Sequence, residues 1–279
     1  MRKDTMKMAI DKWVFGSVLR EQLVAAHRGY RAIRAENTMS AFEACIGKCD
    51  FVELDVGFSR DGVAIIIHDD TLERTSDVKL QSNFTPPYNV VDYSYKELLE
   101  LDFSSWFIEQ DPFQTIQNKL VTKRELESLP IQRIPTLQEA LLFFKQHNMP
   151  VNVEIKDLKK TDFDDTATEH VISIIQELDM EDMILLSSFN HSYIAKAHKI
   201  APMITCAALQ EKAHHGNLIE YLKKLKVQCY HSEISITDAK LVSSLNNAGI
   251  IVNVFTANKP EDKTRLYDYG VKSIFTDFL

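Results

Sequence analysis

The sequence predicts an α/β fold, a (β/α)8 TIM barrel, and two observations support that class. From residue 150 onward, short apolar runs rich in β-branched residues alternate with amphipathic stretches, as they do in successive β-α units. The chain has 279 residues and is 45% hydrophobic, so it has the usual length of one such barrel and can bury a large core. We therefore expect a single domain that spans residues 1–279.

The second half of the chain is expected to supply six of the eight barrel strands. These strands are residues 151–156, 183–189, 204–209, 227–231, 250–256 and 273–275. Amphipathic segments separate them, and the clearest predicted helices cover residues 164–178 and 238–247. The sequence contains no internal repeat, and it stops four residues after the last strand, so we expect no C-terminal domain.

The first half is expected to supply the other two barrel strands, residues 23–27 and 51–56. Between them, Asn37 and Thr38 can start a helix that runs to about residue 48, because both side chains are good N-caps. Residues 1–22 form a predicted N-terminal extension. Charged residues interrupt this extension where a secretory signal would need an unbroken apolar stretch, so we expect a cytoplasmic protein.

A ninth apolar run, residues 63–68, follows the second strand too closely for a parallel crossover but at a distance that suits a β-hairpin. If Asp61 and Gly62 form a two-residue turn, counting back along the hairpin places Asp55 opposite His68 on one face. Opposed side chains in such a pair lie about 5 Å apart. The hairpin is therefore expected to bring an imidazole next to an acidic strand.

Residues 71–134 do not show the pattern of a β-α unit, and we expect an ordered insertion of about 60 residues there. It contains Pro86-Pro87 and one helical stretch at residues 95–101. Its aromatic residues Tyr93, Trp106 and Phe107 are expected to pack the insertion. The barrel pattern resumes at Pro135-Thr136, a plausible start for a helix over residues 137–146.

Composition excludes several classes of partner. The net charge of -8 repels polyanions and no basic run offsets it, so we expect no nucleic acid partner. The longest apolar runs have the length of strands, so we expect no stable membrane insertion. The four cysteines, which form no Cys-x-x-Cys pair, are expected to be buried thiols: Cys45, Cys49, Cys206 and Cys229. A small-molecule substrate is the partner that remains.

Polar residues in the predicted strands indicate a metal site. Glu53 and Asp55 are two residues apart in one strand and therefore share a face, as do Glu154 and Lys156 in another. Three carboxylates that converge from two strands suit one divalent cation, Mg2+ or Ca2+, better than zinc. The alternative is a purely structural network in which these carboxylates pair with cations. The candidate cations for that network are Arg28, Arg34 and Lys156.

Two histidines are expected at the same mouth, since His27 ends the first strand and His68 ends the hairpin. An imidazole can accept or donate a proton near neutral pH, so a pair beside a carboxylate cluster suits acid-base catalysis. Arg28 and Lys156 could bind phosphate, the arginine through its planar fork and the lysine as a point charge. Either histidine alone would more often be structural.

These residues also match a known pattern. The segments His27-Arg28-Gly29, Glu36-Asn37-Thr38, Glu53-Leu54-Asp55-Val56 and His68-Asp69 resemble the signature of the glycerophosphodiester phosphodiesterase family in order and spacing. Later segments are also similar to the family, namely Val153-Glu154-Ile155-Lys156, Ser188-Phe189 and Phe275-Thr276-Asp277. The resemblance covers about residues 23–278.

The resemblance implies a metal-dependent phosphoric diester hydrolase that converts glycerophosphodiesters to glycerol 3-phosphate and an alcohol through a cyclic phosphate. It implies that His27 and His68 are the acid-base pair, while Glu53, Asp55 and Glu154 bind one divalent cation. It implies substrate or phosphate contacts for four residues, Arg28, Lys156, Phe189 and Phe255. It implies supporting roles for Glu36, Asn37 and Asp69, and a homo-oligomer is compatible with it.

The chain departs from the family pattern in its first loop and in its penultimate strand. Ala35 replaces a proline before Glu-Asn-Thr, and Phe255 replaces a tryptophan, which leaves the contact with the alcohol open. Arg31 and Arg34 in the first loop are interpreted as solvated charges, with added anion affinity as the alternative. Two other functions remain open: a lysophospholipase D-type enzyme acting on longer-chain lipids, and a non-catalytic barrel that binds phosphodiesters.

Overall fold

The computed structural model describes residues 22–279, so the predicted N-terminal extension, residues 1–22, lies outside the described residues except for its last one. In the described part, nine strands form one sheet in the order β1-β9-β8-β7-β6-β5-β4-β2-β3, and β1 also pairs with β2. That last pairing closes eight parallel strands into a barrel and leaves β3 bonded antiparallel to β2. The predicted barrel class is confirmed.

The eight barrel strands agree with the predicted ones to within about two residues at each end. They are β1 (Leu23–Ala26), β2 (Phe51–Phe58), β4 (Val151–Ile155), β5 (Ile184–Ser188), β6 (Thr205–Gln210), β7 (Cys229–Glu233), β8 (Ile251–Phe255) and β9 (Ser273–Thr276). The extra strand is β3 (Ala64–Ile66). Strand β2 is the longest of the nine because its carboxyl-terminal half pairs with β3 as well as β4.

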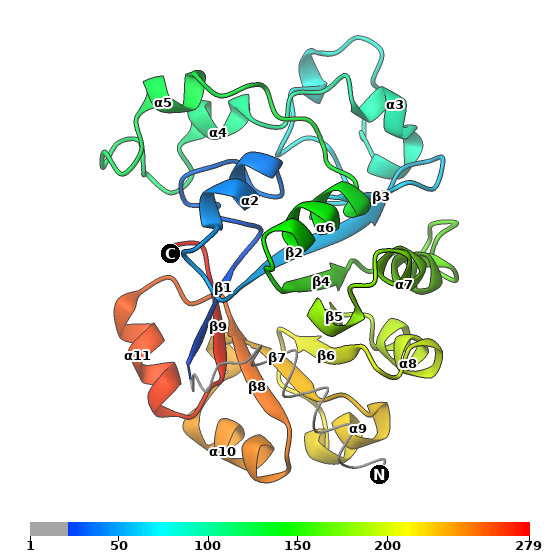
Figure 1. Cartoon of the computed structure of the whole chain (residues 1–279), viewed down its shortest axis with the longest axis vertical. Helices are drawn as coiled ribbons and strands as arrows, with labels where there is room; N and C mark the ends of the chain where they lie inside the picture. The colour runs from blue at the N-terminus through cyan, green and yellow to red at the C-terminus, as the bar shows by residue number, and fades with distance from the viewer. Residues whose placement is uncertain (1–21) are drawn as a thin grey trace.

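Helices between the strands surround the barrel (Figure 1). They are α2 (Met39–Cys45), α6 (Leu137–Gln146), α7 (Ala167–Glu177), α8 (His191–Ile200), α9 (Leu218–Leu225), α10 (Ala239–Asn247) and α11 (Pro260–Asp268). Thr38 caps α2 as expected, and a capping box of Thr136 and Glu139 starts α6 at the predicted residue. Helix α2 ends before Gly47, whose φ of +75° is a left-handed conformation, and so stops short of residue 48.

The segment between β3 and α6 forms a separate lobe beside the barrel, in cyan and green at the top of Figure 1. It contains the short helices α3 (Tyr95–Leu98), α4 (Ser105–Gln110) and α5 (Lys123–Glu127). Its interior is apolar, and Tyr93, Trp106 and Phe107 are all buried within it. These aromatics therefore pack the lobe, as the sequence predicted, and do not line the catalytic mouth.

The predicted register of the hairpin is wrong by one residue. Phe58 pairs with Ala64 and Val56 with Ile66, and Ile67 donates its N–H to the carbonyl of Asp55. The connection is the three-residue loop Arg60-Asp61-Gly62 between Ser59 and Val63, and Gly62 at its end has the left-handed φ of +81° that is usual in such loops. His68 consequently follows the end of β3 and does not lie opposite Asp55.

The side chains of β3 alternate between its two faces and so connect the lobe to the barrel. Ala64 and Ile66 pack into the main core between barrel and helices, whereas Ile65 and Ile67 pack into the core of the lobe. Because successive side chains of a strand point to opposite faces, this one short strand serves two cores. The segment that carries His68 is therefore fixed on both sides.

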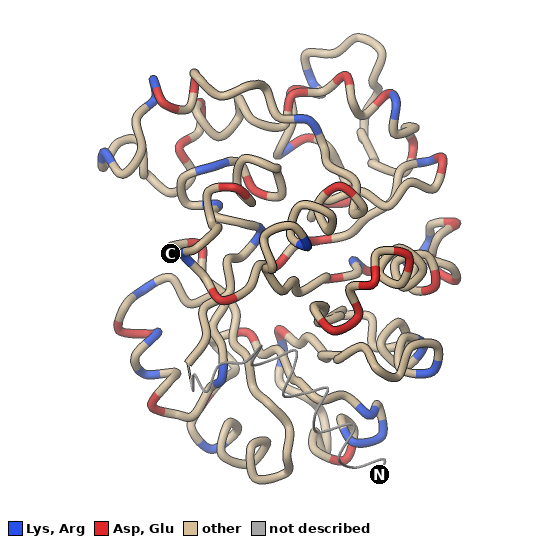
Figure 2. The backbone as a smooth tube through the Cα atoms, viewed as in Figure 1, with Lys and Arg blue, Asp and Glu red and all other residues tan. Residues whose placement is uncertain are grey.

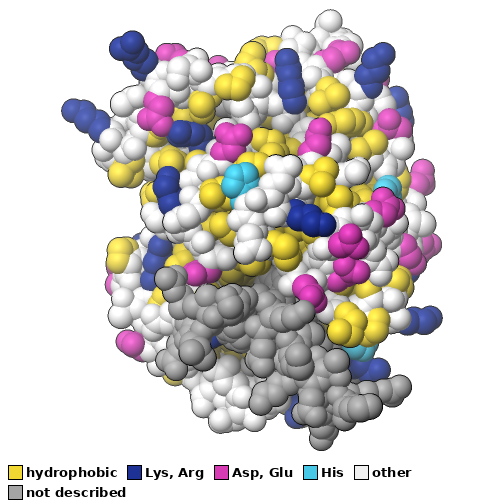
Figure 3. Space-filling view, viewed as in Figure 1, with side chains coloured by type: hydrophobic (Ala, Val, Ile, Leu, Met, Phe, Trp, Pro, Cys, Tyr) yellow, Lys and Arg dark blue, Asp and Glu magenta, His cyan; other side chains and the backbone are white. Residues whose placement is uncertain are grey.

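Three of the four cysteines are buried as expected. Cys45, Cys206 and Cys229 are buried, Cys49 is half-buried, and all four are free. Acidic and basic residues alternate along the described chain (Figure 2), and on the face in Figure 3 both signs are scattered among apolar side chains. None of the helices between residues 22 and 279 has the length and apolar character needed to span a membrane.

Candidate active site

Three carboxylates from neighbouring strands form the centre of the candidate site. Strands β2 and β4 pair with Asp55 opposite Glu154, and Glu53 lies on the same face of β2 as Asp55. One oxygen from each carboxylate lies within 4.8 Å of one oxygen from each of the others, and all three side chains are buried. The strand pattern thus brings together the three residues that the sequence singled out.

The donor set of this cluster fits a hard divalent cation. Burial and repulsion from Asp55 and Glu154 raise the pKa of Glu53 well above its usual range. Oδ1 of Asp55 is buried and makes no hydrogen bond with any described residue, and its one ion-pair partner among them is Nζ of Lys156 at 3.4 Å. Carboxylate oxygens are the ligands that Mg2+ and Ca2+ prefer, and such an ion would both occupy this oxygen and relieve the repulsion.

Two cations of the protein contact the cluster without balancing it. Nε of Arg28 lies 3.2 Å from Asp55, and Nζ of Lys156 lies 2.8 Å from Glu154 and 3.4 Å from Asp55. Burial opposes ionisation of Asp55, but Arg28 and Lys156 outweigh it and hold the pKa of Asp55 well below its usual range. Three buried carboxylates face two cations, so if all three are ionised, as they would be around a bound ion, one negative charge is in excess.

Arg31 and Arg34 correct another expectation, since neither is a solvated loop charge. Their side chains are only 16% and 13% exposed. Arg31 donates to Glu36 at 2.7 Å and lies 3.6 Å from Asp277, whereas Arg34 pairs with Glu125 at 2.7 Å. Arg34 is therefore bound away from the acidic cluster and cannot be the third cation of a structural network there.

The loop after β1 requires unusual backbone geometry. Arg28, Gly29 and Asn37 have φ of +55°, +78° and +56°. A Cβ at Gly29 would lie 2.8 Å from the backbone carbon of Ala41, so only glycine fits this close approach. Nδ2 of Asn37 donates to Asp55 at 2.9 Å. The loop thus folds tightly enough for Asn37 to orient a carboxylate of the cluster.

His27 directly follows β1 and is bound to a carboxylate from the far end of the chain. Its Nδ1 lies 2.7 Å from Oδ1 of Asp277, and Nη1 of Arg31 lies 3.4 Å from the same nitrogen. The shorter contact requires Nδ1 to donate its proton, which leaves Nε2 as the acceptor. Burial and the nearby Arg28 lower the pKa of His27, while Asp277 opposes them, and the net lowering favours the neutral imidazole.

His68 has a matching arrangement on the other side of the site. Its Nδ1 lies 2.6 Å from Oδ1 of Asp69, which again leaves Nε2 available. Arg74 donates to the same carboxylate through Nε at 2.6 Å. Burial opposes ionisation of Asp69, but His68 and Arg74 outweigh it and hold the pKa of Asp69 below its usual range.

Glu36 joins the two halves of the site. It accepts hydrogen bonds from Arg28 and Arg31 at 2.7 Å, and from Arg74 at 2.7 and 2.9 Å. Burial opposes ionisation of Glu36, but these three guanidinium groups outweigh it and hold the pKa of Glu36 well below its usual range. Because Arg74 also binds Asp69, one chain of ion pairs connects the His68 side to Arg28 and the acidic cluster.

A cavity of about 210 Å³ lies over this arrangement. Its lining includes both histidines, Arg28, Glu53, Glu154, Phe189, Phe255 and the buried His231. The rings of Phe189 and Phe255 meet edge to face with their centroids 5.9 Å apart and form an apolar wall. Lys156 and Asp55 do not line this cavity, although Lys156 pairs with both Asp55 and Glu154.

Sequence reasoning missed two residues that the fold brings to the histidines. Asp277 lies 250 positions from His27 along the chain and comes to it because β1 and β9 are neighbours in the closed barrel. Arg74 lies in the lobe segment just after β3. A usable signal existed for Asp277, which directly follows the last strand just as His27 follows the first. Arg74 lies in a segment, Leu72-Glu73-Arg74-Thr75, that is similar to the family signature, but no role for it could be predicted from the sequence.

Comparison with known proteins gives a consistent result. The model of the Glycerophosphoryl diester phosphodiesterase family matches residues 27–279. A glycerophosphodiester phosphodiesterase of Bacillus altitudinis is 31% identical over 262 residues, which cover 91% of this chain and 94% of that protein. One from Caldanaerobacter subterraneus is 29% identical and covers 91% of this chain and 93% of its own.

Solved structures agree with the sequence relatives. An Oleispira antarctica phosphodiesterase in complex with the product sn-glycerol-3-phosphate superposes with a TM-score of 0.74 at 27% identity, covering 92% of this chain and 93% of that chain. A structure from Silicibacter pomeroyi superposes with a TM-score of 0.77 at 21% identity over 97% and 94% of the two chains. At that identity the second match shows the fold alone.

Proposed function

Because this chain belongs to the glycerophosphoryl diester phosphodiesterase family and is a phosphoric diester hydrolase, we propose that it uses one divalent cation and two histidines to release glycerol 3-phosphate from glycerophosphodiesters. One observation carries the proposal. His27 and His68 each bind a carboxylate through Nδ1, and both line the cavity that contains Glu53 and Glu154. A solely phosphodiester-binding barrel would not require two imidazoles oriented in this way.

In the proposed site, Glu53, Asp55 and Glu154 hold the cation. When bound, that cation neutralises negative charge on the phosphoryl oxygens. Arg28 adds a planar guanidinium, whose Nη2 makes no hydrogen bond with residues 22–279 and can donate to phosphate. Lys156 supplies a further positive charge next to Asp55 and Glu154.

Each of the two imidazoles has one role in the proposed reaction. Neutral His27 accepts the proton of the glycerol 2-hydroxyl, which attacks phosphorus and forms a cyclic phosphate. His68 donates a proton to the oxygen of the departing alcohol. Water then opens the cyclic phosphate to glycerol 3-phosphate while the two imidazoles exchange roles. Glu36, Asn37 and Asp69 act indirectly, since they orient Arg28, Asp55 and His68.

Phe189 and Phe255 provide the wall against which we place the carbon skeleton of the glycerol. Phe189 is 38% exposed, so the wall reaches the cavity mouth. An apolar mouth would also suit the chain of a lysophospholipid, which keeps the lysophospholipase D-type activity as a second candidate. Hydrolysis of lysophosphatidylcholine faster than of glycerophosphocholine would favour that second activity.

The test of the proposal is the release of glycerol 3-phosphate from a panel of deacylated phospholipids after chelation, with and without added Mg2+ or Ca2+. We expect turnover to be lost on chelation and restored by one of the two cations. Failure to hydrolyse any member of the panel with either cation would overturn the proposal.

A cytoplasmic location, a single domain, the absence of nucleic acid partners and a homo-oligomeric state remain predictions.

Asp277 is predicted to position His27 and to raise its pKa. In Asp277→Asn the opposing effects of burial, Arg28 and Arg31 remain, so the pKa of His27 falls further. Since His27 acts in its neutral form, the acidic limb of the pH dependence of kcat/KM should move to lower pH. We also expect kcat to fall about tenfold or more, because the ring loses its orienting carboxylate.

Asp262→Asn is a suitable control for this change. Asp262 lies in α11 and pairs with Arg265 at 2.6 Å, so its replacement removes one charge without touching His27. Its pH profile should coincide with that of the unmodified protein. An unshifted acidic limb in Asp277→Asn would show that the carboxylate does not act on His27.

A further inference from the structure

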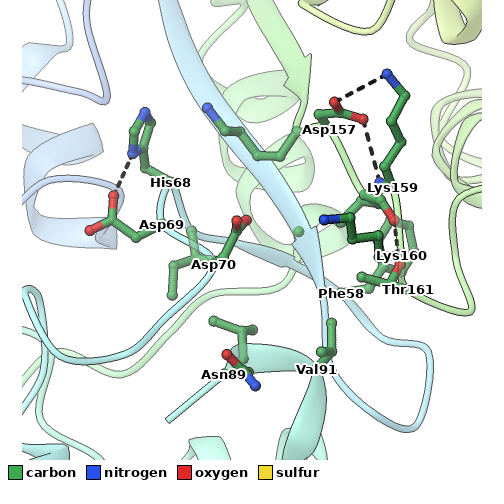
Figure 4. Close-up of a pocket in the computed structure, with 15 residues that line it drawn as sticks. Phe58, His68, Asp69, Asp70, Asn89, Val91, Asp157, Lys159, Lys160 and Thr161 are labelled. Atoms are coloured by element: carbon green, nitrogen blue, oxygen red, sulfur yellow. Dashed lines mark hydrogen bonds and ion pairs between the residues drawn. The ribbon is translucent and has the colours of Figure 1, made fainter. Parts of the chain in front are cut away.

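A second cavity, of about 350 Å³, lies next to the catalytic one (Figure 4). It is enclosed by the end of β2, the segment after β3, the start of the lobe and the loop between β4 and α7. Its apolar lining includes Phe58, Ile67 and Leu158. His68 lines both cavities, so this ring stands between the two spaces.

Because His68 lines both cavities, each cavity can receive a different part of the substrate. In an in-line displacement the attacking and leaving oxygens lie on opposite sides of phosphorus. His27 lines only the smaller cavity, and Lys156 only the larger. If His27 serves the attacking glycerol hydroxyl, the oxygen protonated by His68 belongs to an alcohol that extends into the larger cavity.

Two opposite charges in the larger cavity are not neutralised by the protein. Asp70 and Lys160 are exposed residues whose carboxylate and ammonium both line it, and neither forms an ion pair or a side-chain hydrogen bond with residues 22–279. The neighbouring charges are engaged, since Lys159 lies 3.6 Å from Asp157 and Asp69 binds His68. In Figure 4, Lys160 extends from the wall opposite Asp70 toward the interior.

We propose that this cavity binds the alcohol of the glycerophosphodiester and selects a zwitterionic amino alcohol, with Asp70 binding its ammonium group and Lys160 its carboxylate. The inference rests on the proposed function and adds the class of head group. A cavity of about 350 Å³ has room for such a small polar group beside its apolar floor. Opposite charges on two walls favour a molecule that carries both charges over one that carries one or none.

Three substrates separate the two contacts: glycerophosphoserine carries both charges on its alcohol, glycerophosphoethanolamine only the ammonium, and glycerophosphoglycerol neither. Values of kcat/KM relative to glycerophosphoglycerol are the readout. Asp70→Asn should lower the relative values for the serine and ethanolamine substrates about fivefold, the effect expected for losing one partly exposed ion pair. Lys160→Gln should lower only the serine value.

Two surface variants control for the general change in charge. Asp162→Asn and Lys96→Gln remove the same charges from exposed residues that line neither cavity, and they should leave the relative values unchanged. Equal effects in the controls, or unchanged ratios in Asp70→Asn and Lys160→Gln, would overturn the inference while the phosphodiesterase activity stands. If the unmodified protein hydrolyses none of the three substrates, the proposed function and this inference both fail.

Discussion

Replacing His27 or His68 with alanine should lower kcat for a glycerophosphodiester by about a hundredfold or more, because acid-base catalysis contributes at least this much. Each Nε2 is the free nitrogen of a ring whose Nδ1 is bound to a carboxylate. Removing either ring leaves one proton transfer without its donor or acceptor. KM should change much less than kcat, since neither ring carries the phosphate-binding charge.

The fold of both variants must be intact for this result to be informative. Circular dichroism and thermal unfolding should match those of the unmodified protein, and His215→Ala, at an exposed position outside both cavities, should retain full activity. Near-normal hydrolysis by both His27→Ala and His68→Ala would contradict the proposed chemistry. If only one of the two variants loses activity, only the histidine replaced in that variant takes part in acid-base catalysis.

Glu154→Gln should weaken binding of the divalent cation by about a hundredfold or more, because even groups that merely orient metal ligands account for 10–100-fold. Glutamine keeps the size of the side chain but removes one of three negative charges within 4.8 Å of each other. Isothermal titration calorimetry of the chelated protein with Mg2+ and with Ca2+ measures the change. Activity should fall in parallel and recover in part at high cation concentration.

The matched control for this variant is Glu233→Gln, at the end of β7. Glu233 caps the turn at residues 234–236 and makes no contact with the acidic cluster. Its cation affinity should equal that of the unmodified protein. Unchanged affinity in Glu154→Gln itself would mean that the three carboxylates are structural and that the cation binds elsewhere.

Much of the acidic cluster could be predicted because it depends on local rules. Side chains two apart in a strand share a face, and parallel strands of a barrel end at the same rim. Glu53, Asp55 and Glu154 follow from these rules once the strands are located. The strands can be located from the sequence because each is a short run rich in β-branched residues bounded by an amphipathic helix.

The hairpin register was not predictable by the same counting. Whether Arg60 belongs to the strand or to the loop depends on a left-handed residue at Gly62 and on the hydrogen bonds between Ser59 and Val63. Two- and three-residue loops share the same sequence signal, and they differ by one residue in register. His68 still reaches the site because the chain leaves β3 directly after Ile66.

Long-range ion pairs were the least predictable part. Arg31 resembled a solvated loop charge, yet Glu36 and Asp277 bind it in a nearly buried position. Such a contact depends on barrel closure, which places the ends of β1 and β9 side by side. The spacing of residues within the loop gives no indication of this contact. The supporting network around the histidines therefore emerges only from the three-dimensional structure.

Phosphorus NMR of glycerophosphocholine hydrolysis tests the central claim most directly. With Mg2+ or Ca2+ present, the diester resonance should give way to that of glycerol 3-phosphate, with the cyclic phosphate as a transient, and chelation should stop the reaction. Phosphocholine as the product would place the cleavage on the other side of phosphorus. That product, or undiminished turnover in the presence of chelator, would contradict the account.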